Sequence, residues 1–114
     1  MEIRAMIERF EPQCEQEVQD KRMMLSYMDR FDDLLFRSNE TAHFTASGWI
    51  VNPARTQVLM AYHNIYDSWA WTGGHADGEA DLAAVALREA QEETGLQRIE
   101  TASRNPISLE ILPV

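Results

Sequence analysis

The chain has 114 residues, of which 45% are hydrophobic and 25% are charged, and its formal net charge is -9. This length allows one small domain with a single modest core, and the composition is that of an ordinary globular protein. The acidic balance argues against direct binding to nucleic-acid backbones or anionic membranes, which both require basic patches. The sequence has no long apolar stretch and its first residues mix charges too early for a secretory signal, so a cytoplasmic location is expected.

The acidic charge is concentrated in two regions. Residues 1–40 hold ten acids and six bases, and residues 75–100 hold seven acids and two bases, while the rest of the chain balances. The second region contains the stretch that carries most of the functional information.

Residues 1–37 are predicted to form an N-terminal helical extension. Its first part has apolar residues at helical spacing, namely Ile3, Met6, Ile7 and Phe10. Pro12 interrupts this pattern and is predicted to be the first residue of a second helix, where its missing N–H is tolerated. The methionines of the extension are expected to fill gaps in a core or against the following domain, rather than to form a ligand surface.

Residues 38–114 are predicted to form the main domain. Apolar and polar residues alternate from Phe44 to Ile50, which is the period of a strand, and Asn52-Pro53 supplies a turn towards a second strand within residues 57–66. The two strands are predicted to form a hairpin. A third extended segment carries Trp69 and Trp71.

The next element is predicted to be a helix from about Leu82 to Thr94. Asp81 is placed to cap its first amides, and Gly95 is placed to close it in a left-handed conformation. Its alanines give it a strong helical propensity. Residues 107–114 alternate again and are predicted to form a last strand.

Three glutamates, Glu89, Glu92 and Glu93, gather in the last turns of this helix, where the macrodipole disfavours negative charge. Residues three and four apart share a helical face, so these carboxylates repel one another unless a cation lies among them. A hard divalent cation such as Mg²⁺ takes oxygen ligands and would resolve the conflict. The alternative is a solvated acidic face paired with Arg88 and Arg98.

Gly73 and Gly74 follow the third extended segment, and bare backbone there can approach an ion or a phosphate closely. Two adjacent glycines alone most often mark a turn. Together with carboxylates at this spacing, they indicate a functional site.

The stretch from Gly74 to Leu96 resembles the signature of the Nudix hydrolases, G-x5-E-x7-R-E-U-x-E-E-x-G-U, in which U is aliphatic. The residues that match in place are Gly74, Arg88, Glu89, Ala90, Glu92, Glu93, Gly95 and Leu96. At the first glutamate of the signature this chain has Ala80, with Glu79 one residue earlier. The resemblance implies an α/β fold, a Nudix-type α/β/α sandwich around a mixed sheet. The sheet is expected to be incomplete, because only nineteen residues follow Gly95. The family's fold usually continues there with more strands and another helix.

The resemblance also implies hydrolysis of the diphosphate linkage in a nucleoside diphosphate linked to another moiety, with Mg²⁺ or Mn²⁺ as cofactor. The metal ligands carried over by position are Gly73, through its carbonyl, and Glu89, Glu92 and Glu93. The catalytic residues carried over are Glu89, which would hold metal or help to activate water, Arg88, which would orient the carboxylates, and Glu92. The expected partner is a small nucleotide, not nucleic acid or a membrane, and the sequence names neither that nucleotide nor the residues that bind it.

Two other functions stay open. A nucleotide-binding module that keeps the pocket without turnover agrees with Ala80 and with the short part that follows Gly95. An isoprenoid diphosphate isomerase on the same fold lacks support, because the only cysteine, Cys14, is not near the strand region.

The histidines and aromatic residues receive no catalytic role from their spacing. His43 and His63 are expected to be packed or to face substrate, and His75 occupies a variable position of the signature. The aromatic residues that could stack a base are Trp49, Tyr62, Tyr66, Trp69 and Trp71. Most of them are expected to pack in the core.

The predicted last strand has apolar residues at Ile107, Leu109 and Ile111 and would expose an edge. This predicts either a twofold homodimer or completion of the sheet by further strands of a longer protein. In a third alternative, the N-terminal helices cover the strand and leave a monomer.

Overall fold

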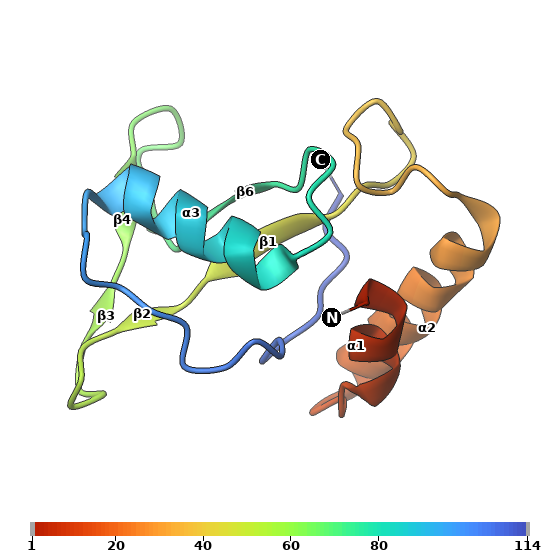
Figure 1. The fold of residues 1–114 in the computed structure, drawn as a ribbon, viewed down its shortest axis with the longest axis horizontal. Helices are drawn as coiled ribbons and strands as arrows, with labels where there is room; N and C mark the ends of the chain where they lie inside the picture. Colours follow the sequence, from red (N-terminus) through yellow and green to blue (C-terminus); the bar gives the residue numbers. More distant parts are fainter. Residues whose placement is uncertain (1, 114) are drawn as a thin grey trace.

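The sequence folds into two N-terminal helices, six short strands and a third helix (Figure 1), seen in a computed structural model that describes residues 2–113. Residues 1 and 114, which begin and end the two predicted regions, lie outside the described range. No helix within residues 2–113 is long and apolar enough to cross a membrane.

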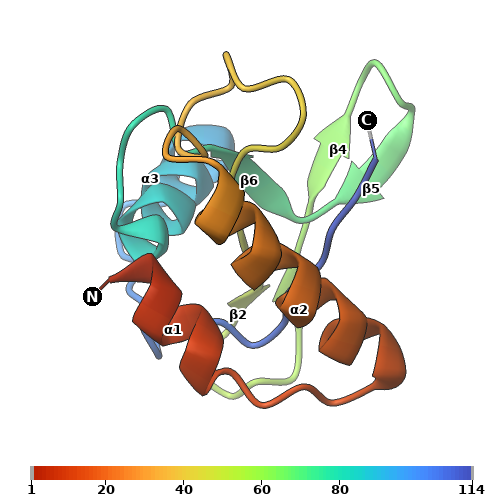
Figure 2. The same cartoon turned by 90° about the vertical axis from the view of Figure 1, so that its right-hand side faces the viewer.

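Helices α1 (Ile3–Arg9) and α2 (Glu15–Arg30) lie side by side (Figure 2). The prediction that α2 begins at Pro12 was wrong, because Cys14 is its N-cap. The Glu17 carboxylate accepts the N–H of Gln13 at 2.8 Å. Gln13 therefore still belongs to the turn between the helices, and α2 begins after it. Lys21 Nζ donates at 2.8 Å to the carbonyls of both Glu8 and Phe10 and so joins the C-terminal end of α1 to α2.

The helical extension also ends earlier than predicted, at Arg30. Residues 31–44 form turns that reach the strands, where Phe44 N–H donates to Leu34 O at 2.7 Å and Gly78 N–H donates to Leu35 O at 2.9 Å. This segment therefore connects the extension to the main domain through backbone hydrogen bonds.

The strands form three antiparallel pairs within residues 2–113. The pairs are β1 (Thr45–Gly48) with β6 (Thr72–His75), β2 (Ile50–Val51) with β3 (Val58–Leu59), and β4 (Ala61–His63) with β5 (Ser68–Ala70). The predicted hairpin is confirmed only where β2 pairs with β3, since β1 pairs with β6 and β4 pairs with β5 instead. Its turn is held by Asn52, whose side-chain oxygen accepts the amides of Thr56 and Gln57.

Helix α3 (Leu82–Thr94) packs across β1 and β6 (Figure 1). Both predicted caps are confirmed. Asp81 Oδ1 accepts the N–H of Ala84 at 3.2 Å, and Gly95 closes the helix with a φ of 75°. The helix is therefore fixed at both ends by local sequence.

The apolar core joins the two predicted regions of the chain. Its buried cluster consists of Ile3, Ile7, Phe10 and Leu109. Partly buried residues packed against this cluster include Met24 and Met28 from α2, Phe44 and Leu82. The methionines Met24 and Met28 thus pack as predicted, whereas Met23 is 49% exposed. The division of the chain at residues 37 and 38 stays a prediction.

The prediction of a last strand was wrong for the described part of residues 107–114, because residues 107–113 form no strand. Leu109 N–H donates to Glu17 Oε2 at 3.4 Å and Ile111 N–H donates to Asp20 Oδ2 at 3.2 Å. Carboxylates of α2 thus accept the amides that a neighbouring strand would otherwise accept. Leu109 is buried in the core with α1, so the N-terminal helices cover its side chain.

Candidate functional site

The glycine pair of the signature lies on β6, where Gly73 is opposite Ser47 and Gly74 is opposite Ala46 of β1. Side chains alternate between the faces of a strand. The face of Gly74 is turned towards α3, since a Cβ there would lie 2.5 Å from Cδ and 2.7 Å from Oε1 of Glu89. The Glu89 carboxylate therefore occupies the space that any side chain at residue 74 would need.

Glu93 is also placed against β6. The backbone N–H of Gly73 donates to Glu93 Oε2 at 3.1 Å, one helical turn beyond Glu89. Glu92 is exposed on the same last turns of α3. Two of the three predicted carboxylates thus converge on the glycine pair, and the third is open to solvent beside them.

Arg88 lies next to Glu89, with its Nη2 at 3.5 Å from Glu89 Oε1. The Arg88 side chain is well exposed, whereas the Glu89 side chain keeps only 20% of its surface in contact with solvent. This contact is long for a hydrogen bond, so it acts chiefly through charge.

The departure from the signature at Ala80 is partly compensated by Glu79. Glu79 Oε1 accepts the N–H of Asp81 at 2.9 Å, and Asp81 in turn caps α3 and forms an ion pair with Arg104. A glutamate one residue early therefore still supports the loop before α3. Sequence reasoning missed this role because nothing in the spacing shows which way Glu79 points.

Within residues 2–113, no group of three or more His, Cys, Asp or Glu side chains is arranged to hold a metal ion. The groups near Gly73 are nevertheless suited to one class of ion. The carboxylates of Glu89, Glu92 and Glu93, with a backbone carbonyl, are hard oxygen donors, which Mg²⁺ and Mn²⁺ prefer. The chemistry of the donors therefore fits these ions.

Two histidines meet near the end of β6. The rings of His43 and His75 have centroids 5.1 Å apart, and His43 Nδ1 lies 3.1 Å from Asn39 O. His75 Nδ1 is buried without a hydrogen-bond partner among residues 2–113. His63 instead contacts Tyr66, with ring centroids 4.6 Å apart.

Sequence reasoning also missed a link between the loop before β1 and the loop after β6. Arg37 donates to both carboxylate oxygens of Asp77, at 3.0 and 2.6 Å. These hydrogen bonds, with charge attraction as a lesser cause, lower the pKa of Asp77 below its usual value. The two residues are forty positions apart, so no local signal could have paired them.

The prediction that most aromatic residues pack in the core was wrong. Trp69 is 68% exposed and Tyr66 is 75% exposed, while Trp49, Tyr62 and Trp71 also belong to the exposed class. The reason is that β4 and β5 pair with each other as two strands, and their aromatic rings pack edge to face across the ladder with one side towards solvent.

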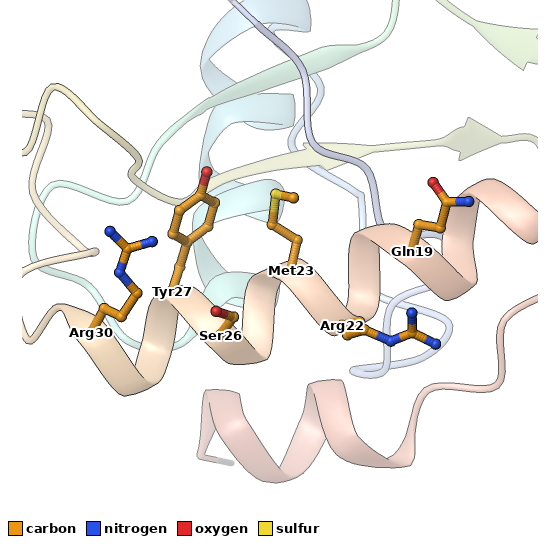
Figure 3. Close-up of a pocket in the computed structure, with 6 residues that line it drawn as sticks. All are labelled: Gln19, Arg22, Met23, Ser26, Tyr27 and Arg30. Atoms are coloured by element: carbon orange, nitrogen blue, oxygen red, sulfur yellow. The ribbon is translucent and has the colours of Figure 1, made fainter.

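A groove of about 460 Å³ lies apart from the glycine pair, on the outer face of α2 (Figure 3). Its lining residues are Gln19, Arg22, Met23, Ser26, Tyr27 and Arg30. All six belong to α2, so the groove is formed by one helix and contains none of the predicted site residues.

Much of the chain matches a known protein family. A family model of the NUDIX domain matches residues 41–108, which is more than half of the chain. A comparison with curated proteins gave no match. The matched range contains β1 to β6 and α3, in an α/β arrangement whose sheet is incomplete, as predicted. The chain therefore belongs to the Nudix family, with its signature running from Gly74 on β6 to Leu96 just after α3.

Proposed function

We propose that this protein is a metal-dependent hydrolase that cleaves the diphosphate linkage in a nucleoside diphosphate linked to another moiety. Membership of the Nudix family supports hydrolysis of nucleoside diphosphate compounds in general. The observation that carries the finer proposal is the placement of Glu89 and Glu93 against Gly74 and Gly73. The choice among nucleotides is open, and the substrate is a small molecule.

In this proposal Glu89, Glu92, Glu93 and the carbonyl of Gly73 would hold Mg²⁺ or Mn²⁺. Such an ion neutralises charge that develops on phosphate oxygens and lowers the pKa of a bound water. Glu93 uses one carboxylate oxygen for the N–H of Gly73, which fixes the side chain and leaves the other oxygen for the ion. A ligand held in this way is positioned before metal arrives.

Glu89 is the residue proposed to help activate the attacking water. Its side chain is the less exposed of the two carboxylates placed against β6, and the lack of a side chain at Gly74 leaves room for it. Arg88 would orient Glu89 by charge from 3.5 Å. The catalytic residues in this proposal are therefore Glu89, Arg88 and Glu92.

A nucleotide-binding module without turnover is the second candidate. It is favoured by Ala80, which removes a carboxylate from the signature. The two candidates share the same binding site. They differ only in whether bound nucleotide is cleaved.

The proposed setting is the cytoplasm. An exposed, unpaired Cys14 is expected in a reducing compartment. The net charge of -9 supports a small nucleotide, carried to the site with a divalent cation, over nucleic acid or an anionic membrane as the partner.

The test is a screen of nucleoside diphosphate derivatives with Mg²⁺ or Mn²⁺, followed by the same assay on Glu92→Gln. The expected result is cleavage by the unaltered chain and a loss of about 100-fold or more in the variant. Glu100→Gln removes the same charge from an exposed position beyond α3 and should cleave normally. Metal-dependent nucleotide binding with no cleavage of any derivative would select the binding module.

A further inference from the structure

The end of the molecule formed by β2 to β5 exposes an unusual number of aromatic side chains. We refer to Trp49, Tyr62, Ile65, Tyr66, Trp69 and Trp71 as the aromatic end. Figure 1 shows that β2, β3 and β4 lie at the opposite end of the long axis from α1 and α2. The aromatic end is thus far from the helices that cover the core.

The rings in the aromatic end contact one another but cover one another poorly. Tyr62 lies opposite Trp69 in the β4–β5 ladder, with ring centroids 5.3 Å apart, and the rings of Trp49 and Trp71 have centroids 6.2 Å apart. An isolated two-stranded hairpin is only marginally stable in water and normally packs against another layer. The β4–β5 hairpin therefore gains stability from any surface that covers these rings.

The chain as a whole exposes more surface than a compact monomer of its mass. The chain exposes 8377 Å² and has a mass of 13.1 kDa. A folded monomer of that mass exposes about 6,400 Å², so the chain carries a surplus of about 2,000 Å². Homodimers that form obligately bury about 1,000 to 2,500 Å² on each protomer, which brackets this surplus.

The charge distribution indicates which kind of surface can cover the aromatic end. In a twofold dimer the same patch meets itself, so any net charge on the patch would be repelled by its own copy. Residues 49–71 contain one base, Arg55, and one acid, Asp67, and are therefore neutral in a chain of net charge -9. Aromatic enrichment with few charges is also the composition of an interface core.

We propose that the aromatic end docks onto the aromatic end of a second copy of this chain and forms a twofold dimer. Trp69 and Tyr62, which pair across the hairpin and face solvent, are the anchors of the interface. This interface differs from the one that the sequence predicted, which relied on a strand edge at residues 107–114. It uses none of the proposed metal ligands.

The test is the mass of the full chain in solution, measured by sedimentation or light scattering from about 1 to about 200 μM. The expected mass is twice 13.1 kDa at the upper concentrations. Trp69→Lys and, separately, Tyr62→Lys should each raise the dissociation constant at least about 30-fold, because they place like charges opposite one another in a buried core. Both positions are exposed and lie outside the three helices, so the helical circular dichroism signal should be unchanged.

The matched control is Met23→Lys, which adds the same charge at an exposed apolar residue of α2, and it should leave the dimer intact. A monomer across the whole concentration range overturns the proposal. This also holds for a monomer whose tryptophan fluorescence is quenched by nucleotides. A dimer that neither aromatic variant weakens also overturns it, as does one that Met23→Lys weakens as much as Trp69→Lys.

Discussion

The Glu89 carboxylate occupies the space that a side chain at Gly74 would need. In Gly74→Ala the new methyl group would overlap Cδ and Oε1 of Glu89 and push this flexible side chain aside. Turnover should fall by about 100-fold, because small displacements of a catalytic group have large effects. The free energy of unfolding should change by less than about 1 kcal/mol, because only the end of one side chain must move.

Gly48→Ala is the matched control for this change. Gly48 lies on β1, also turned towards α3, but a Cβ there would meet only Thr72 Oγ1 at 3.5 Å and Ala86 O at 3.8 Å, which are ordinary contacts. Steady-state kinetics and thermal melts of both variants give the comparison. Equal activity in the two variants would show that the Glu89 position is unimportant.

The ion pair of Arg37 and Asp77 makes the free energy of unfolding depend on pH in the acid range. Because Arg37 lowers the pKa of Asp77 in the folded chain, the fold favours the ionised carboxylate. The contribution is complete above the usual carboxyl pKa and is lost as pH falls through the lowered value. Melting temperatures measured below about pH 4 should therefore fall more steeply for the unaltered chain than for Arg37→Met.

The control for this measurement is Arg98→Met, which removes an exposed base and should keep the steep dependence. If melting temperature depends on pH equally in Arg37→Met and in the unaltered chain, the ion pair between Arg37 and Asp77 contributes nothing to stability in solution.

At the scale of single elements, α3 depends on its caps. Asp81→Ala removes the oxygen that accepts the N–H of Ala84 and also breaks the ion pair with Arg104. The free energy of unfolding should fall by about 1 kcal/mol, which denaturant titration can measure. Arg104→Ala breaks only the exposed pair and should cost clearly less. An equal cost in the two variants would contradict the cap.

The segment of residues 107–113 is held by acidic side chains of α2. Asp20→Ala removes the acceptor of the Ile111 N–H. That amide should then exchange with deuterium roughly ten-fold faster, since a hydrogen bond to a charged group contributes about 1.5 kcal/mol. Glu15→Ala, at an exposed acid of the same helix, should leave the exchange rate unaltered, and equal rates in both variants would refute this attachment.

These elements also show what the sequence could and could not predict. Asp81, the alanines and Gly95 act within one helix, so α3 was correct from end to end. The alternation at 107–113 is the same for a strand and for a segment that lies on a helix, and the deciding contacts come from Glu17 and Asp20, about ninety residues away. Local pattern cannot distinguish these two cases.

The candidate site was predictable to a similar extent. The spacing of Glu89 and Glu93 fixed which residues share a helical face, and the structure brings both to the glycine pair. The exposure of Trp69 was not predictable, because an aromatic residue on a strand is buried or exposed according to what covers that face of the sheet. Trp69 and its neighbours in the sequence do not show whether its side chain is buried or exposed.

For the whole molecule, the proposed function requires that α3 and β6 together bind a divalent metal ion. The most direct measurement is a calorimetric titration of the full chain with Mn²⁺ near neutral pH, repeated with Glu93→Gln and with Glu100→Gln. Glutamine keeps an oxygen for the N–H of Gly73 but removes the charge that holds the ion. We expect binding by the unaltered chain and by Glu100→Gln, with affinity at least about ten-fold weaker in Glu93→Gln. Absence of Mn²⁺ binding, or equal binding by all three proteins, would contradict it.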